Sequence, residues 1–148
     1  MAALDFPDHR RDPAGWARQL GISRAAVDLY LASDVIDLHV DTFVWARVFG
    51  YDLRRRHGPG LFRARFYGHV DLPRLRAARV TGALWSITTN PLRTAAGRAR
   101  TFQRNYARLR ALLESCSEDG ALARSAADYA AAKSAGQHAA FLVVQGAN

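Results

Sequence analysis

Three ionisable side chains alternate with aliphatic ones in a short segment, residues 35–41. The alternation predicts a β-strand with Asp37, His39 and Asp41 on one face and the aliphatic residues on the other. Polar groups on the inward face of a buried strand are costly unless they are paired or bind a metal. A neutral imidazole and a carboxylate suit Zn²⁺, and His39 and Asp41 are close enough to reach one cation. The segment therefore predicts a metal site. The alternative is a strand end whose polar groups meet solvent or loop backbone.

The elements that must position this segment alternate between strands and helices. Runs of apolar residues predict two further strands, over residues 82–88 and 139–144. Helices are predicted over residues 16–20, 23–32, 72–79, 97–115 and 125–136, and a long loop over residues 50–68. Apolar strands that alternate with helices are typical of a parallel sheet covered on both faces. The sequence therefore predicts an α/β fold.

Length and composition exclude several classes of protein. The chain has 148 residues, of which 49% are hydrophobic, so it can form one folded domain and is not mainly disordered. Its single cysteine, Cys116, excludes a disulfide scaffold. The sequence contains no run of 18 apolar residues, so it predicts no membrane span. No secretory signal is visible either, so we expect a cytoplasmic protein.

The sequence gives little support to two other functions, nucleic-acid binding and serine-hydrolase chemistry. The formal net charge of +8 is compatible with nucleic-acid binding, for which the Arg-rich residues 54–65 are the candidate segment. A solvated loop explains the same residues, and because charge alone identifies no partner we expect no nucleic-acid partner. Ser86 and Ser115 lack the surroundings of a nucleophile elbow, so the sequence does not favour serine-hydrolase chemistry.

Three blocks of the chain resemble the membrane dipeptidase (renal dipeptidase) family of zinc peptidases. They are Asp37-Leu38-His39-Val40-Asp41-Thr42, then residues 68–77 followed by Gly82-Ala83-Leu84-Trp85-Ser86, and finally residues 131–136 with the strand leading to Gln145-Gly146. The blocks follow one another in the family's order and cover roughly residues 28–148. The resemblance implies a TIM-like (β/α)8 barrel. Residues 34–148 would be its amino-terminal part, truncated after the third strand, and residues 1–33 a helical extension.

The resemblance also implies roles for individual residues. His39 and Asp41 would be zinc ligands at the end of the first strand, with Asp37 as a carboxylate that supports them. In the family a Glu that closes the third strand bridges two zinc ions, and two later histidines complete the site. Gln145 stands at the position of that Glu, and a neutral amide normally binds only one metal. The other histidines, His9, His57, His69 and His138, do not match the later ligands in order or context.

The function implied is zinc-dependent hydrolysis of the peptide bond of dipeptides or similar small amides. Because the later histidine ligands have no counterpart, we expect the chain to be a fragment that is inactive alone. The alternative is a catalytically inactive pseudoenzyme or interaction module that retains the fold. We also expect the exposed apolar sheet of such a chain to cause aggregation or formation of a homodimer.

Overall fold

The structure is a computed structural model that describes residues 11–58, 70–89 and 92–145. Some residues discussed above lie outside these ranges. They are His9, Gly68 and His69, the second half of the Arg-rich segment, and Gly146.

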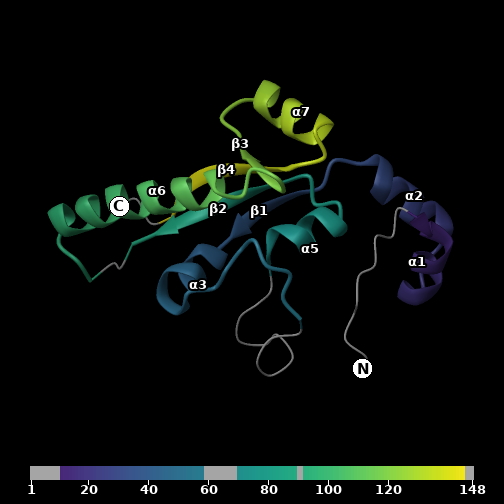
Figure 1. Ribbon diagram of the computed structural model, residues 1–148, viewed down its shortest axis with the longest axis horizontal. Coiled ribbons are helices and arrows are strands. Elements are labelled where there is room, and N and C mark those ends of the chain that lie inside the picture. The colour runs from purple at the N-terminus through teal and green to yellow at the C-terminus, as the bar shows by residue number, and fades with distance from the viewer. Residues whose placement is uncertain (1–10, 59–69, 90–91, 146–148) are drawn as a thin grey trace.

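Four parallel strands form one sheet in the order β1-β2-β4-β3 (Figure 1). The strands are β1 (Ile36–Val40), β2 (Gly82–Thr88), β3 (Gly120–Leu122) and β4 (His138–Gln145). The predicted α/β fold and its three strands are confirmed, as β1, β2 and β4. The short β3, which pairs with the start of β4, was not predicted. The sheet is open in the described part of the chain, so the barrel implied by the resemblance stays a prediction.

Six helices are present among the described residues. They are α1 (Pro13–Leu20), α2 (Arg24–Ala32), α3 (Thr42–Phe49), α5 (Leu72–Ala77), α6 (Ala95–Glu114) and α7 (Ala126–Ser134). Five of them begin at a side chain that accepts a hydrogen bond from the backbone N–H three residues later: Asp12, Ser23, Asp71, Thr94 and Ser125. These local capping bonds explain why the sequence locates most helix starts well.

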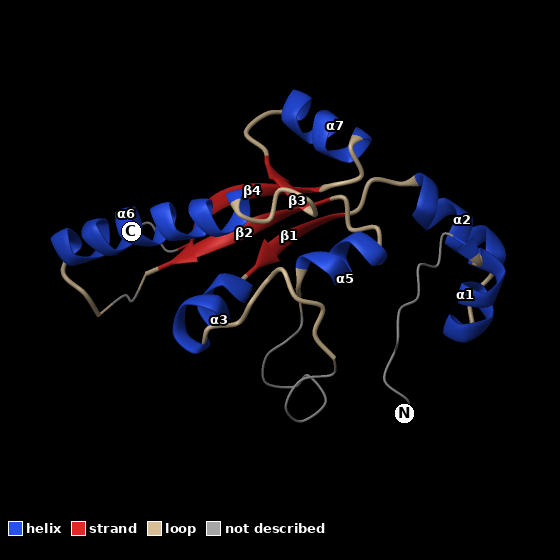
Figure 2. Ribbon diagram, in the orientation of Figure 1, coloured by secondary structure: helices blue, strands red, loops and turns tan. Residues whose placement is uncertain are grey.

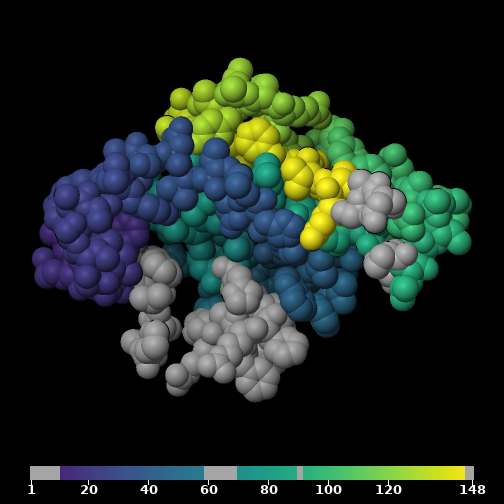
Figure 3. All heavy atoms as spheres, turned by 180° about the vertical axis from the view of Figure 1, so that it is seen from behind, coloured from purple at the N-terminus to yellow at the C-terminus, as the bar shows by residue number. Residues whose placement is uncertain are grey.

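The sheet has a different cover on each face (Figure 2). Helices α3, α5 and α6 pack on the first face over a core that includes Trp85, Leu72 and Leu109. Helix α7 packs on the second face, where Ala132 and Tyr129 meet the amino-terminal part of β4. In the view from behind, β4 is visible below α7 and beside the blue part of the chain that contains β1 (Figure 3).

Helices α1 and α2 form a hairpin with a small core of their own around Trp16 and Val27. The Tyr30 hydroxyl joins α2 to the rest of the chain by donating a hydrogen bond to the backbone oxygen of Ala78. No helix in the described ranges is both long and apolar enough to cross a membrane.

Candidate metal centre

His39 and Asp41 meet at the carboxyl end of β1. The distance from His39 Nε2 to Asp41 Oδ2 is 3.0 Å, and the two side chains are 51% and 46% exposed. Asp41 is the residue that precedes α3, yet its side chain makes no capping bond to that helix. The carboxylate is therefore directed at the imidazole and not at the helix start. One nitrogen and one oxygen that could bind a metal thus lie side by side where solvent can reach them.

A β-bulge in β1 determines which way these side chains point. Asp37 pairs with Ala83 and Val40 pairs with Trp85, so two residues of β1 stand opposite the single residue between Ala83 and Trp85. Asp37 and Val40 therefore lie on the first face, and His39 lies on the second. The predicted alternation, with Asp37 and His39 on the same face, is wrong because the bulge inserts one extra residue between them.

The Asp37 side chain is part of this bulge. Its Oδ1 accepts a hydrogen bond from the backbone N–H of His39 at 2.9 Å. A bond from an Asp side chain to the N–H two residues later stabilises a local turn and competes with regular strand pairing. Asp37 is thus in contact with the backbone of His39, while the role that the resemblance gives it stays a prediction. The aliphatic Leu38 in the bulge is 71% exposed and is not a core residue.

Gln145 lies on the same face of the sheet as His39. It is the last residue of β4 and pairs with Thr88 of β2, and the residues at alternate positions from Ala139 onward share its face. One strand, β2, separates it from β1, which corresponds to about 10 Å across two strand spacings. The structure therefore places Gln145 near the carboxyl ends of the strands but does not bring it into contact with His39 or Asp41.

Ser86 lies on β2, between β1 and β4. Its side chain is 1% exposed, and its Oγ has no hydrogen-bond partner among the described residues. It shares the second face with His39 because its neighbours Trp85 and Ile87 belong to the core on the first face. Nothing in the sequence pattern distinguishes this serine from an ordinary small strand residue.

A family model described as membrane dipeptidase (Peptidase family M19) matches residues 23–148. The chain belongs to this family. The family resemblance stated from three sequence blocks is confirmed, and the match extends from the start of α2 through β4. A search of curated proteins finds no match for the chain. Membership of the M19 family supports a dipeptidase-like metallohydrolase at the level of the family.

The residues at the end of β1 fit a divalent metal in their chemistry. Imidazole nitrogen and carboxylate oxygen are both zinc ligands, and here they already converge within 3.0 Å of each other. No group of three or more His, Cys, Asp or Glu side chains is close enough to hold a metal in the described part of the chain. His39 and Asp41 are therefore two candidate ligands of a site that needs at least one more.

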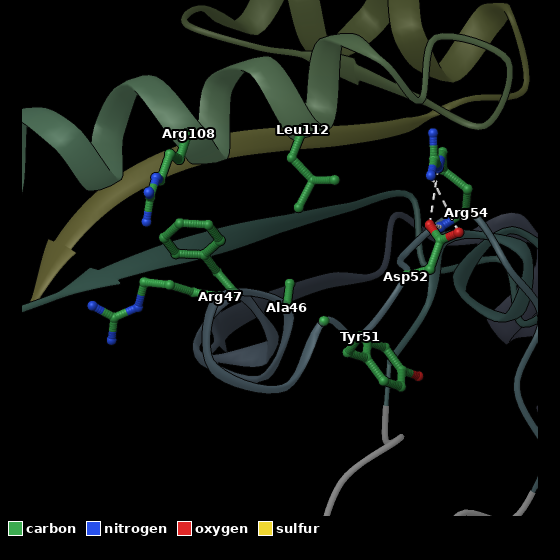
Figure 4. A pocket seen from close by; sticks show the side chains of 9 residues that line it. Ala46, Arg47, Tyr51, Asp52, Arg54, Arg108 and Leu112 are labelled. Carbon is green, nitrogen blue, oxygen red and sulfur yellow. Dashed lines mark hydrogen bonds and ion pairs between the residues drawn. The ribbon is translucent and has the colours of Figure 1, made fainter.

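A cavity of about 580 Å³ lies apart from this site, between α3 and α6 (Figure 4). Among its lining residues are Phe43, Arg47, Tyr51, Arg54, Arg108 and Leu112. Arg54 is neutralised by Asp52, whose Oδ1 accepts a hydrogen bond from Arg54 Nε at 2.9 Å. Because α3 and α6 cover the first face of the sheet, this cavity is on the opposite face from His39 and does not contribute to the candidate metal centre.

Proposed function

We propose that this chain carries the first-strand half of a zinc-dependent hydrolase site that acts on the peptide bond of dipeptides or similar small amides. The observation that carries the proposal is the His39–Asp41 pair at the end of β1, in a chain that belongs to the membrane dipeptidase family. We further propose that the sheet is part of a (β/α)8 barrel, in which active sites lie at the carboxyl ends of the strands.

Each residue has a separate task in this proposal. His39 Nε2 and Asp41 Oδ2 would hold the metal, in place of the contact that they now make with each other. Asp37 would fix the backbone of His39 through its hydrogen bond to the His39 N–H. Gln145 would offer an amide oxygen from β4 on the same face. A zinc ion bound there supplies Lewis-acid activation of water and of a peptide carbonyl.

Gln145 supports a second candidate function, an inactive member of the family that retains the fold. An amide oxygen is neutral, whereas a carboxylate offers two anionic oxygens that can bind two metals. Two divalent ions without a bridging anion repel each other strongly. A chain with Gln145 would then bind one metal weakly or none, and would serve as an interaction module.

Zinc binding and a dipeptide assay together separate the two candidates. We would measure zinc affinity, and hydrolysis of L-alanyl-L-alanine at saturating zinc, for the 148-residue chain, for Gln145→Glu and for Gln145→Glu combined with His39→Ala. Because His39 and Asp41 form only part of a complete site, the hydrolase proposal predicts zinc binding that strengthens in Gln145→Glu and weakens when His39 is also replaced, with any turnover following the same order. Zinc binding that is equally weak or absent in all three forms would favour the inactive module. Turnover that survives His39→Ala would contradict the proposed site.

A further inference from the structure

The buried hydroxyl of Ser86 requires an explanation that the fold does not supply. Ser86 is 1% exposed, and its Oγ is inaccessible to solvent. This Oγ has no hydrogen-bond partner in the described ranges. Buried polar groups are almost always hydrogen-bonded, because an unmet one loses its contacts with water and gains nothing in return. An exception in a native fold requires an explanation, and a partner that arrives with a bound ion is one such explanation.

The strand register places this hydroxyl beside the candidate metal centre. Ser86 pairs with Val143 of β4, and its predecessor Trp85 pairs with Val40 of β1. The residue that follows Val40 is Asp41, so Ser86 and Asp41 stand one step beyond the same cross-strand pair. Both lie toward the carboxyl ends of the strands, where β1 gives way to α3.

Asp41 does not hydrogen-bond to Ser86 in its present contact with His39. Asp41 Oδ2 faces His39 Nε2 at 3.0 Å, and a cation that binds both atoms must replace this contact. The Asp41 side chain is 46% exposed and makes no capping bond, so neither burial nor the start of α3 holds it in its present orientation. A carboxylate that binds a metal through one oxygen usually accepts a hydrogen bond on the other.

We propose that Ser86 is a positioning residue of the candidate metal centre: when the metal is bound, its Oγ–H donates a hydrogen bond to the Asp41 carboxylate. This inference rests on the proposed function. It explains why Ser86, on β2 between β1 and β4, has a hydroxyl that lacks a hydrogen-bond partner when no metal is bound. Ser86 touches neither substrate nor metal in this role and acts only through Asp41.

The stability of the metal-free chain distinguishes the proposed role of Ser86 from a purely structural one. In the proposed role the hydroxyl lacks a partner until the metal binds, so Ser86→Ala leaves the melting temperature of the metal-free chain the same or raises it. If the hydroxyl stabilises the fold, the same variant lowers the melting temperature. Thr81, just before β2, is the control, because its partly buried hydroxyl already has hydrogen-bond partners. Thr81 Oγ1 donates to the backbone oxygen of Val35 at 2.9 Å and accepts from the Val35 N–H at 3.0 Å.

The experiment compares the 148-residue chain with Ser86→Ala, Ser86→Thr and Thr81→Val. Two quantities are measured for each: the melting temperature in the presence of a chelator, and the zinc dissociation constant by competition with a coloured chelator. For Ser86→Ala we expect an unchanged or higher melting temperature and roughly 10- to 100-fold weaker zinc binding. Ser86→Thr keeps the hydroxyl and should restore the affinity. Thr81→Val should lower the melting temperature and leave zinc binding unchanged.

Three results would overturn the inference, and they differ in what else they contradict. If Ser86→Ala lowers the melting temperature in the presence of the chelator, the hydroxyl stabilises the metal-free fold and Ser86 has a structural role. If wild type binds zinc and Ser86→Ala binds it equally well, Ser86 does not position Asp41, while the proposed function stands. If wild type binds no zinc, both the role of Ser86 and the proposed metal centre are wrong.

Discussion

Trp85 Nε1 donates a hydrogen bond to Nε2 of His138 at 3.1 Å, in the core between β2 and β4. The other ring nitrogen, Nδ1, lies 2.9 Å from the backbone oxygen of Val80. Nε2 must therefore be the acceptor and Nδ1 the protonated donor, which fixes His138 as one neutral tautomer. Its side chain is 1% exposed, so this histidine is a core residue and not a metal ligand.

His138 should make the stability of the chain depend on pH. Burial lowers the pKa of His138 below its usual value of 6.5, and the Val80 carbonyl and the charge of Asp37 oppose that shift only in part. The neutral form therefore stabilises the fold above pH 6.5, and this contribution is lost as the pH falls toward the lowered pKa. We expect the free energy of unfolding to decrease below pH 6.5 by up to about 1.4 kcal/mol per pH unit from this residue. Urea unfolding of wild type and His138→Gln between pH 5 and 7.5 tests this, and parallel pH profiles would contradict it.

Asp71 should be one of the most sensitive polar positions in the chain. Its fully buried carboxylate accepts hydrogen bonds from the Arg74 N–H at 2.9 Å, from Arg74 Nε at 2.6 Å and from the His57 N–H at 2.9 Å. Removing it leaves the Arg74 guanidinium, whose side chain is 20% exposed, without this partner. We expect Asp71→Ala to lower the free energy of unfolding by about 3 kcal/mol or more.

The exposed pair of Asp52 and Arg54 provides the control for Asp71. Both side chains are in contact with solvent, so Asp52→Ala should cost less than about 1 kcal/mol. Chemical unfolding measures both variants. Equal losses of unfolding free energy for Asp71→Ala and Asp52→Ala would contradict this, because burial would then not increase the contribution of Asp71 to stability.

Asp37 should affect zinc binding indirectly, because its hydrogen bond in the β1 bulge fixes the backbone of His39. Asp37→Ala removes the acceptor of the His39 N–H, whereas Asp37→Asn retains an oxygen at that place. We expect zinc binding to weaken roughly tenfold in Asp37→Ala and to remain close to wild type in Asp37→Asn. If both variants bind equally weakly, the charge of Asp37 matters and not its hydrogen bond, and the bulge is not what orients the site.

The edge of the sheet should promote self-association. β1 is an edge strand of the sheet formed by the described residues, and two of its aliphatic side chains, Ile36 and Leu38, are 41% and 71% exposed. Exposed apolar edge strands are common sites of aggregation and pairing between copies, and a lysine on the edge suppresses them. We expect concentration-dependent association in sedimentation that decreases in Leu38→Lys. Leu29→Lys on α2, where the leucine is 69% exposed, is the matched control and should leave association unchanged.

The parts of the fold that the sequence predicts are those set by local chemistry. Apolar runs specify β2 and β4, and capping side chains such as Ser23 and Ser125 mark where helices begin. Helix α3 was not predicted because its residues, among them Val44 and Trp45, are β-branched or aromatic and have low helix propensity. Its helical state depends on packing, since Phe43 is buried in the core of the first face. β3 has only three residues, too few for a periodic pattern.

Only the first two residues of the candidate site could be predicted from the sequence. The proximity of His39 and Asp41 follows from their spacing and is present in the structure. The bulge was not predictable, because it depends on a side-chain contact of Asp37 and on the register with β2. Ser86 was missed because an unmet hydroxyl is a property of its surroundings in three dimensions and has no counterpart in the sequence.

Zinc binding by His39 and Asp41 is the central claim, and the most direct measurement is the zinc stoichiometry and dissociation constant of the purified chain. The comparison variants are His39→Ala and Asp41→Asn, with His57→Gln as a histidine control outside β1. The account predicts about one zinc ion per chain, with binding weakened at least roughly tenfold in either β1 variant and unchanged in His57→Gln. Equal zinc binding by wild type and both β1 variants, or no zinc binding by wild type, would contradict it.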